Sequence, residues 1–303
     1  MEIGRPRFVF RDEIFARRPH RAASVRFAGL WVCGSLAALA SPTVAIVGPR
    51  APSAGGLARA HDIAAEVSRA GVCVVSGLAL GIDGSAHAGA LVGTTPTVGV
   101  LGGGHRCFFP KRNRELATRM LARGGAVLSP FPPDEPARPP QFLQRNGVVA
   151  ALADAVVVVE AASRSGALNT ASWAADLGID VLAFPGDVDR ALAAGCNALI
   201  RDGATLVRDA DDVLEALGIA RGEAQNETAA VAAGSPVDAS TEHDSLAARI
   251  VRALRAEPRH AEELSELTGA AIGEVVGALV RLEIEGHIQR RDMLRFALVR
   301  GRP

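Results

Sequence analysis

Residues 72–87 read VCVVSGLALGIDGSAH: four apolar residues, a glycine-rich turn and then a segment of helix-forming residues. The run 72–75 has the length and the β-branched content of a buried strand. A strand that leads within a few residues into a helix is the first half of a β-α-β unit. The stretch therefore predicts a parallel sheet with helices packed against it.

The same alternation continues along the chain in both directions. Other apolar runs that read as strands lie at 44–47, 97–101, 126–128, 155–159, 180–183 and 204–207. Segments with helical spacing lie at 55–70, 83–92, 112–123, 142–152, 167–178, 196–201 and 210–218. This pattern predicts an α/β fold with a doubly wound parallel sheet. Because the crossovers are right-handed, the strand-to-helix loops gather at one edge of the sheet, where ligands bind in such folds.

Length and composition narrow the function classes. A chain of 303 residues has room for one main domain and a smaller one. Its net charge is 0, so any anion site must come from a local patch. The four cysteines lack metal-binding spacing, and we expect them to be reduced and to form no metal site.

Residues 27–49 carry no charge and follow an arginine-rich stretch, which is typical of a signal peptide or a membrane span. However, Glu2, Asp12 and Glu13 make the preceding segment partly acidic, and Pro42 divides the apolar run into two pieces of strand length. We therefore expect two buried strands here, no membrane segment and a cytoplasmic protein. Residues 1–26, which are aperiodic, are expected to form a loosely held arm.

The composition changes after the main α/β pattern. Residues 219–244 are small, polar and acidic without periodicity, which predicts a flexible linker. Residues 245–303 contain three helical segments and an alternating tail that reads as a hairpin. Three helices followed by a hairpin predict a winged helix-turn-helix domain, with Thr268 and Gly269 in the turn. We therefore divide the chain into an arm (1–26), an α/β domain (27–218), the linker and the winged domain.

Four strand ends in the α/β domain place Gly, Ser or a charged side chain just before a helix. Glycine lets backbone N–H groups approach an anion, and the helix N-terminus adds partial positive charge. One such loop is weak evidence, but four loops that also hold cations favour phosphate binding. The candidate residues on these loops are Gly48, Arg50, Ser76, Gly77, Gly81, Asp83, Lys111, Arg112, Glu160, Ser165, Gly166 and Thr170.

Lys111 is the only lysine among the 33 basic residues. Its compact charge on a flexible stem suits a phosphate at the mouth of a pocket, although it also fits a solvated position beside a helix. Asp83 and Glu160 fit acid–base work at a glycosidic bond, but more often such carboxylates accept hydrogen bonds from loop N–H groups. The sequence has neither a Walker A motif nor a dinucleotide fingerprint, and we expect no cofactor.

The motifs VAIVGPR, VVSGLALGIDGSAHAGAL, RNGVVAAL and VVVVEAASRSGALNTASWAADLG, in this order, resemble the DNA-processing protein A family (DprA, also called Smf). The resemblance covers about residues 25–218 and the small domain at 245–300. It implies an extended Rossmann-like domain with a C-terminal winged helix. It also implies a protein without catalytic activity that binds single-stranded DNA during natural transformation and delivers the strand to the recombinase RecA, as a homodimer.

Motif matching carries DNA-contacting roles onto particular residues. The resemblance assigns contacts to Arg50, Ser76, Gly77, Lys111 and Arg145, with Ser165 and Gly166 shaping the pocket. Bases need an apolar or aromatic platform. Phe108, Phe109 and Phe142 are candidates for it, with core packing as the alternative reading.

The chain also departs from the family pattern. We expect no counterpart of the usual N-terminal helical SAM-like domain in residues 1–26, and the Arg-Asn-Arg triplet reads Arg145-Asn146-Gly147. Two other functions therefore remain open. One is a hydrolase of the lysine-decarboxylase-like group that cleaves nucleotide N-glycosidic bonds, and the other is a module that senses a small nucleotide. The loop SRSGALNT lacks the glycine run of that hydrolase group.

Overall fold

The computed structural model describes residues 4–219, 246–254, 259–284, 288–290 and 295–298. The chain divides into two compact units, residues 1–229 and 230–303. Residues 220–244 of the linker expected over 219–244 lie outside the described residues. The boundaries assigned from the sequence remain predictions.

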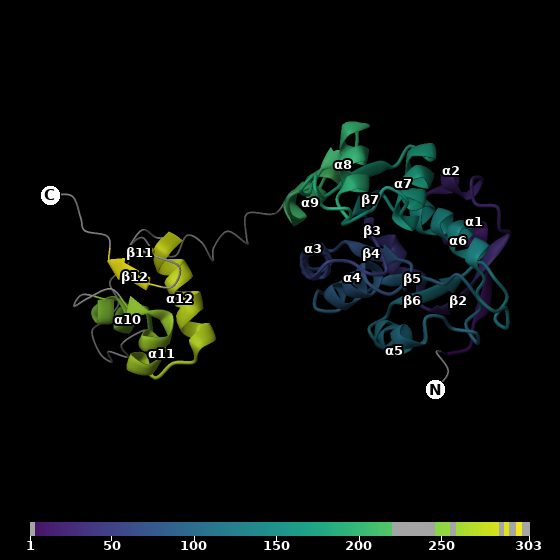
Figure 1. Cartoon of the computed structure of the whole chain (residues 1–303). Helices are drawn as coiled ribbons and strands as arrows, with labels where there is room; N and C mark the ends of the chain where they lie inside the picture. Colours follow the sequence, from purple (N-terminus) through teal and green to yellow (C-terminus); the bar gives the residue numbers. More distant parts are fainter. Residues whose placement is uncertain (1–3, 220–245, 255–258, 285–287, 291–294, 299–303) are drawn as a thin grey trace. The chain divides into compact units, whose positions relative to one another are not determined.

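Nine strands from the described part of the larger unit form one sheet (Figure 1). They are β1 (Arg7–Phe10), β2 (Gly29–Gly34), β3 (Thr43–Val47), β4 (Cys73–Ser76), β5 (Val98–Val100), β6 (Ala126–Ser129), β7 (Ala155–Val158), β8 (Asp180–Ala183) and β9 (Thr205–Leu206). The helices are α1 (Arg11–Ile14), α2 (Pro19–Ala22), α3 (Ala54–Arg69), α4 (Ile82–Ala90), α5 (Arg114–Ala122), α6 (Pro139–Leu152), α7 (Gly166–Asp176), α8 (Ala194–Arg201) and α9 (Ala210–Ala216). Two short 3-10 helices, η1 (Leu36–Ala40) and η2 (Lys111–Asn113), complete the set.

The strand order is β1-β2-β6-β5-β4-β3-β7-β8-β9. Every pair from β6 to β9 is parallel, which confirms the doubly wound α/β fold. At the other end, β2 runs antiparallel to β6 and β1 antiparallel to β2, so the sheet is mostly rather than wholly parallel. Apolar runs reveal which segments are buried but not the direction in which a strand enters the sheet, so the sequence did not show this reversal.

Alternate residues of each strand point to opposite faces of the sheet. On β3, Val44 and Ile46 join the core formed with α3, α4 and α9, whereas Ala45 and Val47 join the core formed with α6 and α7. These two layers of helices lie on either side of the sheet in Figure 1. Burial on both faces explains why the central strands read as continuous apolar runs.

The N-terminal segment differs from the loosely held arm that the sequence predicted. Residues 7–10 pair with β2, and Phe15 is 1% exposed in the core. The Arg18 guanidinium is buried and bonds both carboxylate oxygens of Asp154 and the hydroxyl of Thr43. The elements here are four residues long, too short to produce a visible period, and a buried arginine resembles a solvated one in sequence.

Asp154 is therefore a junction between the N-terminal segment and the sheet. Its carboxylate accepts from Arg18 and from the backbone N–H of Thr43. Burial alone would raise the pKa of Asp154, but these hydrogen bonds outweigh it and hold the pKa below its ordinary value. A lowered carboxyl pKa stabilises the fold at neutral pH, and that stabilisation is lost as the pH falls below about 4.

We expect Asp154→Ala to lower the free energy of unfolding by about 2 kcal/mol, because charged hydrogen bonds are lost and Arg18 stays buried. Urea unfolding followed by tryptophan fluorescence measures this, because both tryptophans, Trp31 and Trp173, lie in the larger unit. Asp176→Ala, at an exposed position on α7, is the matched control. Equal stability of the two variants would contradict the anchoring role.

His87 on α4 is fully buried, and its Nδ1 lies 2.8 Å from the Thr97 hydroxyl, which itself donates to the carbonyl of Val74. The His87 ring thus has a packing role within the larger unit. Burial lowers the pKa of His87 to about 3. The unfolded chain therefore takes up a proton near pH 6.5 while the folded chain does not, so stability falls as the pH drops below that value.

We expect this single group to remove about 1.4 kcal/mol of stability between pH 7.5 and pH 5.5. Urea midpoints across that range should fall less for His87→Gln than for the unmodified chain. An identical pH dependence in both proteins would exclude His87 as the source.

The segment 27–49 forms the two predicted buried strands, β2 and β3. Across the described residues, no helix has the combination of length and apolar character that a membrane span requires.

The smaller unit contains α10 (Leu246–Leu254), α11 (Ala261–Thr268), α12 (Ile272–Ile284) and the strands β10 (Arg259–His260), β11 (Ile288–Arg290) and β12 (Arg295–Leu298). Its sheet has the order β10-β12-β11 with antiparallel pairs. Ile250, Leu264 and Leu279 form its core, one from each helix. Gly269 ends α11 with φ +66°, a left-handed conformation that suits glycine. The predicted winged-helix architecture is confirmed.

Candidate nucleic-acid interface

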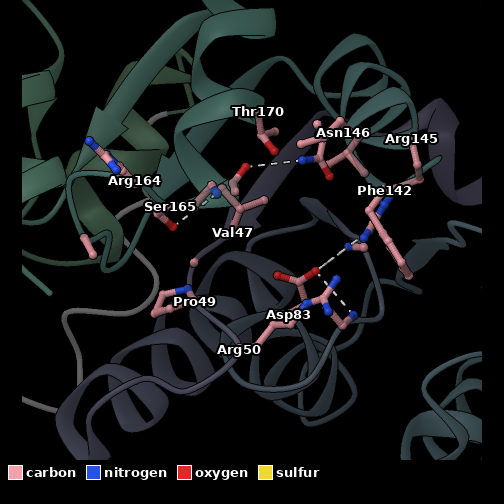
Figure 2. Close-up of a pocket in the computed structure, with 18 of the residues that line it drawn as sticks. Val47, Pro49, Arg50, Asp83, Phe142, Arg145, Asn146, Arg164, Ser165 and Thr170 are labelled. Carbon is pink, nitrogen blue, oxygen red and sulfur yellow. Dashed lines mark hydrogen bonds and ion pairs between the residues drawn. The ribbon is translucent and has the colours of Figure 1, made fainter. Parts of the chain in front are cut away.

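A pocket of about 570 Å³ lies at the carboxyl end of the sheet. Its walls come from the loops after β3, β4 and β7 and from α6 and the start of α7 (Figure 2). β4 and β7 flank β3 on opposite sides in the sheet, so the strand order reverses here. Ligands bind at such reversal points in doubly wound sheets, and the volume lies within the range of small-molecule sites.

Arg145 and Asp83 form the buried floor of this pocket. The guanidinium of Arg145 is 3.9 Å from the Asp83 carboxylate and donates to the carbonyl of Val100. Asp83 in turn accepts from the backbone N–H groups of Gly77 and Ala79. Burial raises the pKa of Asp83 and lowers the pKa of Arg145, and their mutual attraction opposes both shifts.

Gly77 is required by this arrangement. A Cβ on Gly77 would lie 1.3 Å from Nη1 of Arg145, so only glycine leaves room for the guanidinium. Asp83 therefore has the loop-bracing role favoured from the sequence. Arg145, 3% exposed, contributes positive charge from beneath the pocket rather than from an exposed side chain. Its Nε has no hydrogen-bond partner among the described groups.

Arg50 is an exposed cation at the pocket wall. Its guanidinium carbon lies 4.8 Å from the centre of the Phe142 ring, which holds the charge over an aromatic face. Phe109 is 50% exposed, and its ring centre is 6.1 Å from that of Phe142. Arg50, Phe109 and Phe142 together line a small hollow beside the main pocket. Of the three phenylalanines considered, Phe108 alone is buried, 2% exposed.

The start of α7 forms the opposite wall. Ser165 caps this helix by accepting from the N–H of Ala167, and a Cβ on Gly166 would meet nothing within 4 Å. Open space in front of a helix N-terminus is a site where an anion can lie. Arg164 precedes the cap and lines the same pocket (Figure 2). The buried Thr170 also lines it.

Lys111 and Arg112 lie outside the main pocket. Both are exposed on η2, directly after Pro110, which lines the small hollow. The Asn113 amide ties η2 to the loop after β4 by donating to the carbonyls of Leu78 and Ala79. This tether places the two cations at the rim rather than within the pocket.

Three predicted residues have structural roles that differ from a direct contact. Ser76 is fully buried, and its hydroxyl donates to the carbonyl of Ile46. The predicted contact of Ser76 with DNA remains a prediction. Glu160 does not line the pocket. It accepts from the backbone N–H and the hydroxyl of Ser53, at the start of α3. Gly81 has φ +78° and packs against the loop after β3.

Gly48 lines the pocket, and a Cβ there would collide with Ile82. Sequence reasoning missed Arg164 and Asn146, although both stand next to predicted residues. The Asn146 amide donates to the carbonyl of Gly166 and to the side-chain oxygen of Asn169, which joins α6 to α7 at the pocket edge. Arg164 could have been found from the sequence, because it lies between the two serines of the loop motif SRSG.

The electrostatics of the pocket favour an anion. Arg50, Arg145 and Arg164 line it, against the single carboxylate of Asp83, which is already paired and hydrogen-bonded. Both carboxylates considered for acid–base work, Asp83 and Glu160, accept hydrogen bonds from backbone N–H groups. The arrangement is suited to binding phosphate and bases, with cations, open N–H groups and two phenylalanine rings at one site.

Comparison with protein families gives two matches. Residues 9–218 match the family described as DNA recombination-mediator protein A, and residues 234–292 match the DprA winged helix domain. A DprA relative from Mycobacterium tuberculosis is 40% identical over 269 residues, which cover 87% of this chain and 67% of the relative. Protein Smf of Escherichia coli is 40% identical over 66% of this chain and 54% of its own length. The chain thus spans between half and about two thirds of these relatives.

Solved structures show the same fold. The crystal structure of DNA processing protein A from Streptococcus pneumoniae superposes with a TM-score of 0.58 at 38% identity, over 62% of this chain and 66% of that one. A structure of DNA processing protein A from Helicobacter pylori, whose title concerns single-stranded DNA binding, gives a TM-score of 0.61 at 24% identity. It covers 72% of this chain and 98% of its own. With the family match across both units, the chain belongs to the DNA-processing protein A family, DprA/Smf.

Proposed function

We propose that this protein binds single-stranded DNA, largely independently of sequence, at the carboxyl end of its main sheet, and that it does so without catalysing a reaction. The observation that carries the proposal is the cationic pocket at the β3–β7 reversal point, with Arg50, Arg145 and Arg164 around an open helix N-terminus. The family description and the single-stranded DNA binding named for the Helicobacter pylori relative support the same ligand.

Phe109 and Phe142 favour binding of single strands over duplex DNA. Both rings contribute to a surface that adjoins the pocket, and Arg50 stacks on one of them. Unpaired bases stack on such rings, whereas paired bases are held within the duplex. We therefore expect a single strand to bind more tightly than a duplex of the same length.

The direct test is a fluorescence-anisotropy titration of the full chain with a labelled oligothymidine at several salt concentrations. The proposal is supported if the affinity for the oligothymidine falls steeply with salt and if the affinity for a matched duplex is lower. Unlabelled AMP and ADP-ribose serve as competitors. If either displaces the strand at micromolar concentration, or if AMP is hydrolysed, a small-nucleotide sensor or an N-glycosidic hydrolase replaces the present proposal.

Arg50→Ala should weaken oligothymidine binding by about tenfold, the effect of losing one charge-assisted contact. The slope of log affinity against log salt should also fall, by about 0.7 per phosphate contact. Lys111→Ala should show a smaller loss with a similar change of slope. Arg69→Ala, exposed at the far end of α3, changes the net charge equally and should leave the slope unaltered. Unchanged slopes for both Arg50→Ala and Lys111→Ala would dismiss phosphate contacts by these residues.

The wider role follows from family membership and belongs to the same proposal. We infer that the protein acts in the cytoplasm as a homodimer, protects strands taken up in natural transformation and passes them to the RecA recombinase. Sedimentation of the full chain tests the dimer. A measurement of RecA filament assembly on single strands coated with a single-strand-binding protein tests the transfer, and an Arg50→Ala protein that assembles filaments as fast as the unmodified one would oppose it.

A further inference from the structure

A second pocket lies on the other side of α6. It has a volume of about 250 Å³ and is lined by Val25, Arg26 and Phe27 before β2, by Gln144 and Gly147 of α6, and by Trp173 of α7. Nothing in the site described above uses these residues. The volume suits one planar ring system rather than a larger ligand.

Gly147 positions the indole of Trp173. A Cβ on Gly147 would lie 3.1 and 3.2 Å from Cε2 and Cδ2 of that ring, so the indole packs directly on the helix backbone. Trp173 is only partly buried and faces the pocket. A half-buried indole, fixed in place and open on its pocket side, is a stacking platform for a planar group.

The charge of the second pocket favours an anionic chain. Arg26 is exposed at its wall, Gln144 and Ser24 add polar groups, and no carboxylate is found among the residues that line it. A base can stack on the indole while a neighbouring phosphate meets Arg26. An apolar peptide would leave the guanidinium unpaired, so the lining suits a nucleotide better.

The two pockets lie on either side of one helix, α6. Leu143 and Asn146 line the main pocket, while Gln144 and Gly147 line the second, so successive residues of α6 face the two sites. Leu143 is 51% exposed on the surface between them. A helix with its side chains is about 10–12 Å wide, a distance that a few nucleotides of extended strand can cross.

We propose that the Trp173 pocket is a second stacking position for the strand whose neighbouring nucleotides occupy the main pocket. This inference rests on the proposed function, since it requires a single strand at the main site. Short oligonucleotides then fill the main pocket alone, and longer ones also reach Trp173.

Tryptophan fluorescence reports on this contact directly. Trp31 is the other tryptophan of the chain, and Trp31→Phe leaves Trp173 as the sole indole. We expect a 15-residue oligothymidine to quench Trp173 in this background and a trinucleotide to leave its emission unchanged. Trp173→Ala should weaken the longer ligand about tenfold and the trinucleotide hardly at all, and Trp173→Phe should restore most of the affinity.

A variant at an exposed position separates lost binding from lost folding. Gln144 is exposed, and Gln144→Glu places a negative charge at the second pocket without touching the core. It should weaken the 15-residue ligand selectively, whereas Ala175→Glu, exposed on α7 outside the pocket, should not.

This inference would be overturned if the long oligonucleotide left Trp173 emission unaltered and bound Trp173→Ala with full affinity. If binding still depended on Arg50, the proposed function would stand. Failure of the unmodified protein to bind any oligonucleotide would overturn both. Quenching by RecA but not by DNA would assign the pocket to a protein partner instead.

Discussion

Asp83→Ala is expected to destabilise the larger unit by about 3–5 kcal/mol, the usual cost of removing one partner from a buried ion pair. Arg145 would keep its charge at a position only 3% exposed, and the N–H groups of Gly77 and Ala79 would lose their acceptor. The desolvation cost is then no longer offset, which is why the effect exceeds that of a typical surface carboxylate.

Urea unfolding of the full chain, followed by tryptophan fluorescence, gives the measurement. Asp62→Ala removes a carboxylate that is 69% exposed on α3 and should change stability by no more than about 0.5 kcal/mol. If Asp83→Ala costs less than about 1 kcal/mol, the pair does not stabilise the pocket floor as described.

Gly77→Ala is expected to have the second largest effect, combining lost stability with lost binding. The new methyl group would overlap Nη1 of Arg145 and lie 2.6 Å from Oδ2 of Asp83, so the guanidinium must leave its site. Overpacking of this kind costs about 1–3 kcal/mol, and we expect the upper end because a buried charge is displaced. Oligothymidine affinity should fall by at least about tenfold, as for loss of one charged contact.

Gly55→Ala provides the matched control for this substitution. Gly55 lies in the first turn of α3, where a Cβ would meet only the Ser53 hydroxyl at 3.7 Å. Alanine is also the better helix former, so stability should stay constant or rise slightly. Anisotropy titrations and urea melts on both variants decide the matter. Normal binding by Gly77→Ala would mean that Arg145 is not needed in its present position.

Sequence periodicity was sufficient for the parallel part of the sheet because burial on both of its faces forces continuous apolar runs, and the helices between them follow a different period. The runs at 44–47 and 155–159 correspond to β3 and β7, the two strands that frame the pocket. The N-terminal segment was misjudged because its short elements are held by Val9, Phe15 and the buried Arg18, whose burial no local pattern reveals.

The site divides in the same way. Glycine and serine at strand ends identified the loops that line the pocket, because tight strand-to-helix turns need those residues wherever they occur. The roles of individual residues on these loops were predicted less well. Ser76 is buried, Glu160 accepts hydrogen bonds from Ser53, and Arg164 lines the pocket without having been singled out. An exposed and a buried arginine are the same letter in the sequence.

What the sequence determined by itself was therefore the strands and helices of the parallel part of the sheet, their order along the chain and the loops that meet at one edge, since these depend on local period and on turn residues. Only the tertiary structure decided that Arg145 lies beneath the pocket against Asp83, that Arg50 stacks on Phe142, and that Trp173 opens onto a second pocket across α6. These contacts join residues from separate elements, and their burial and charge depend on packing that no single stretch of the chain encodes.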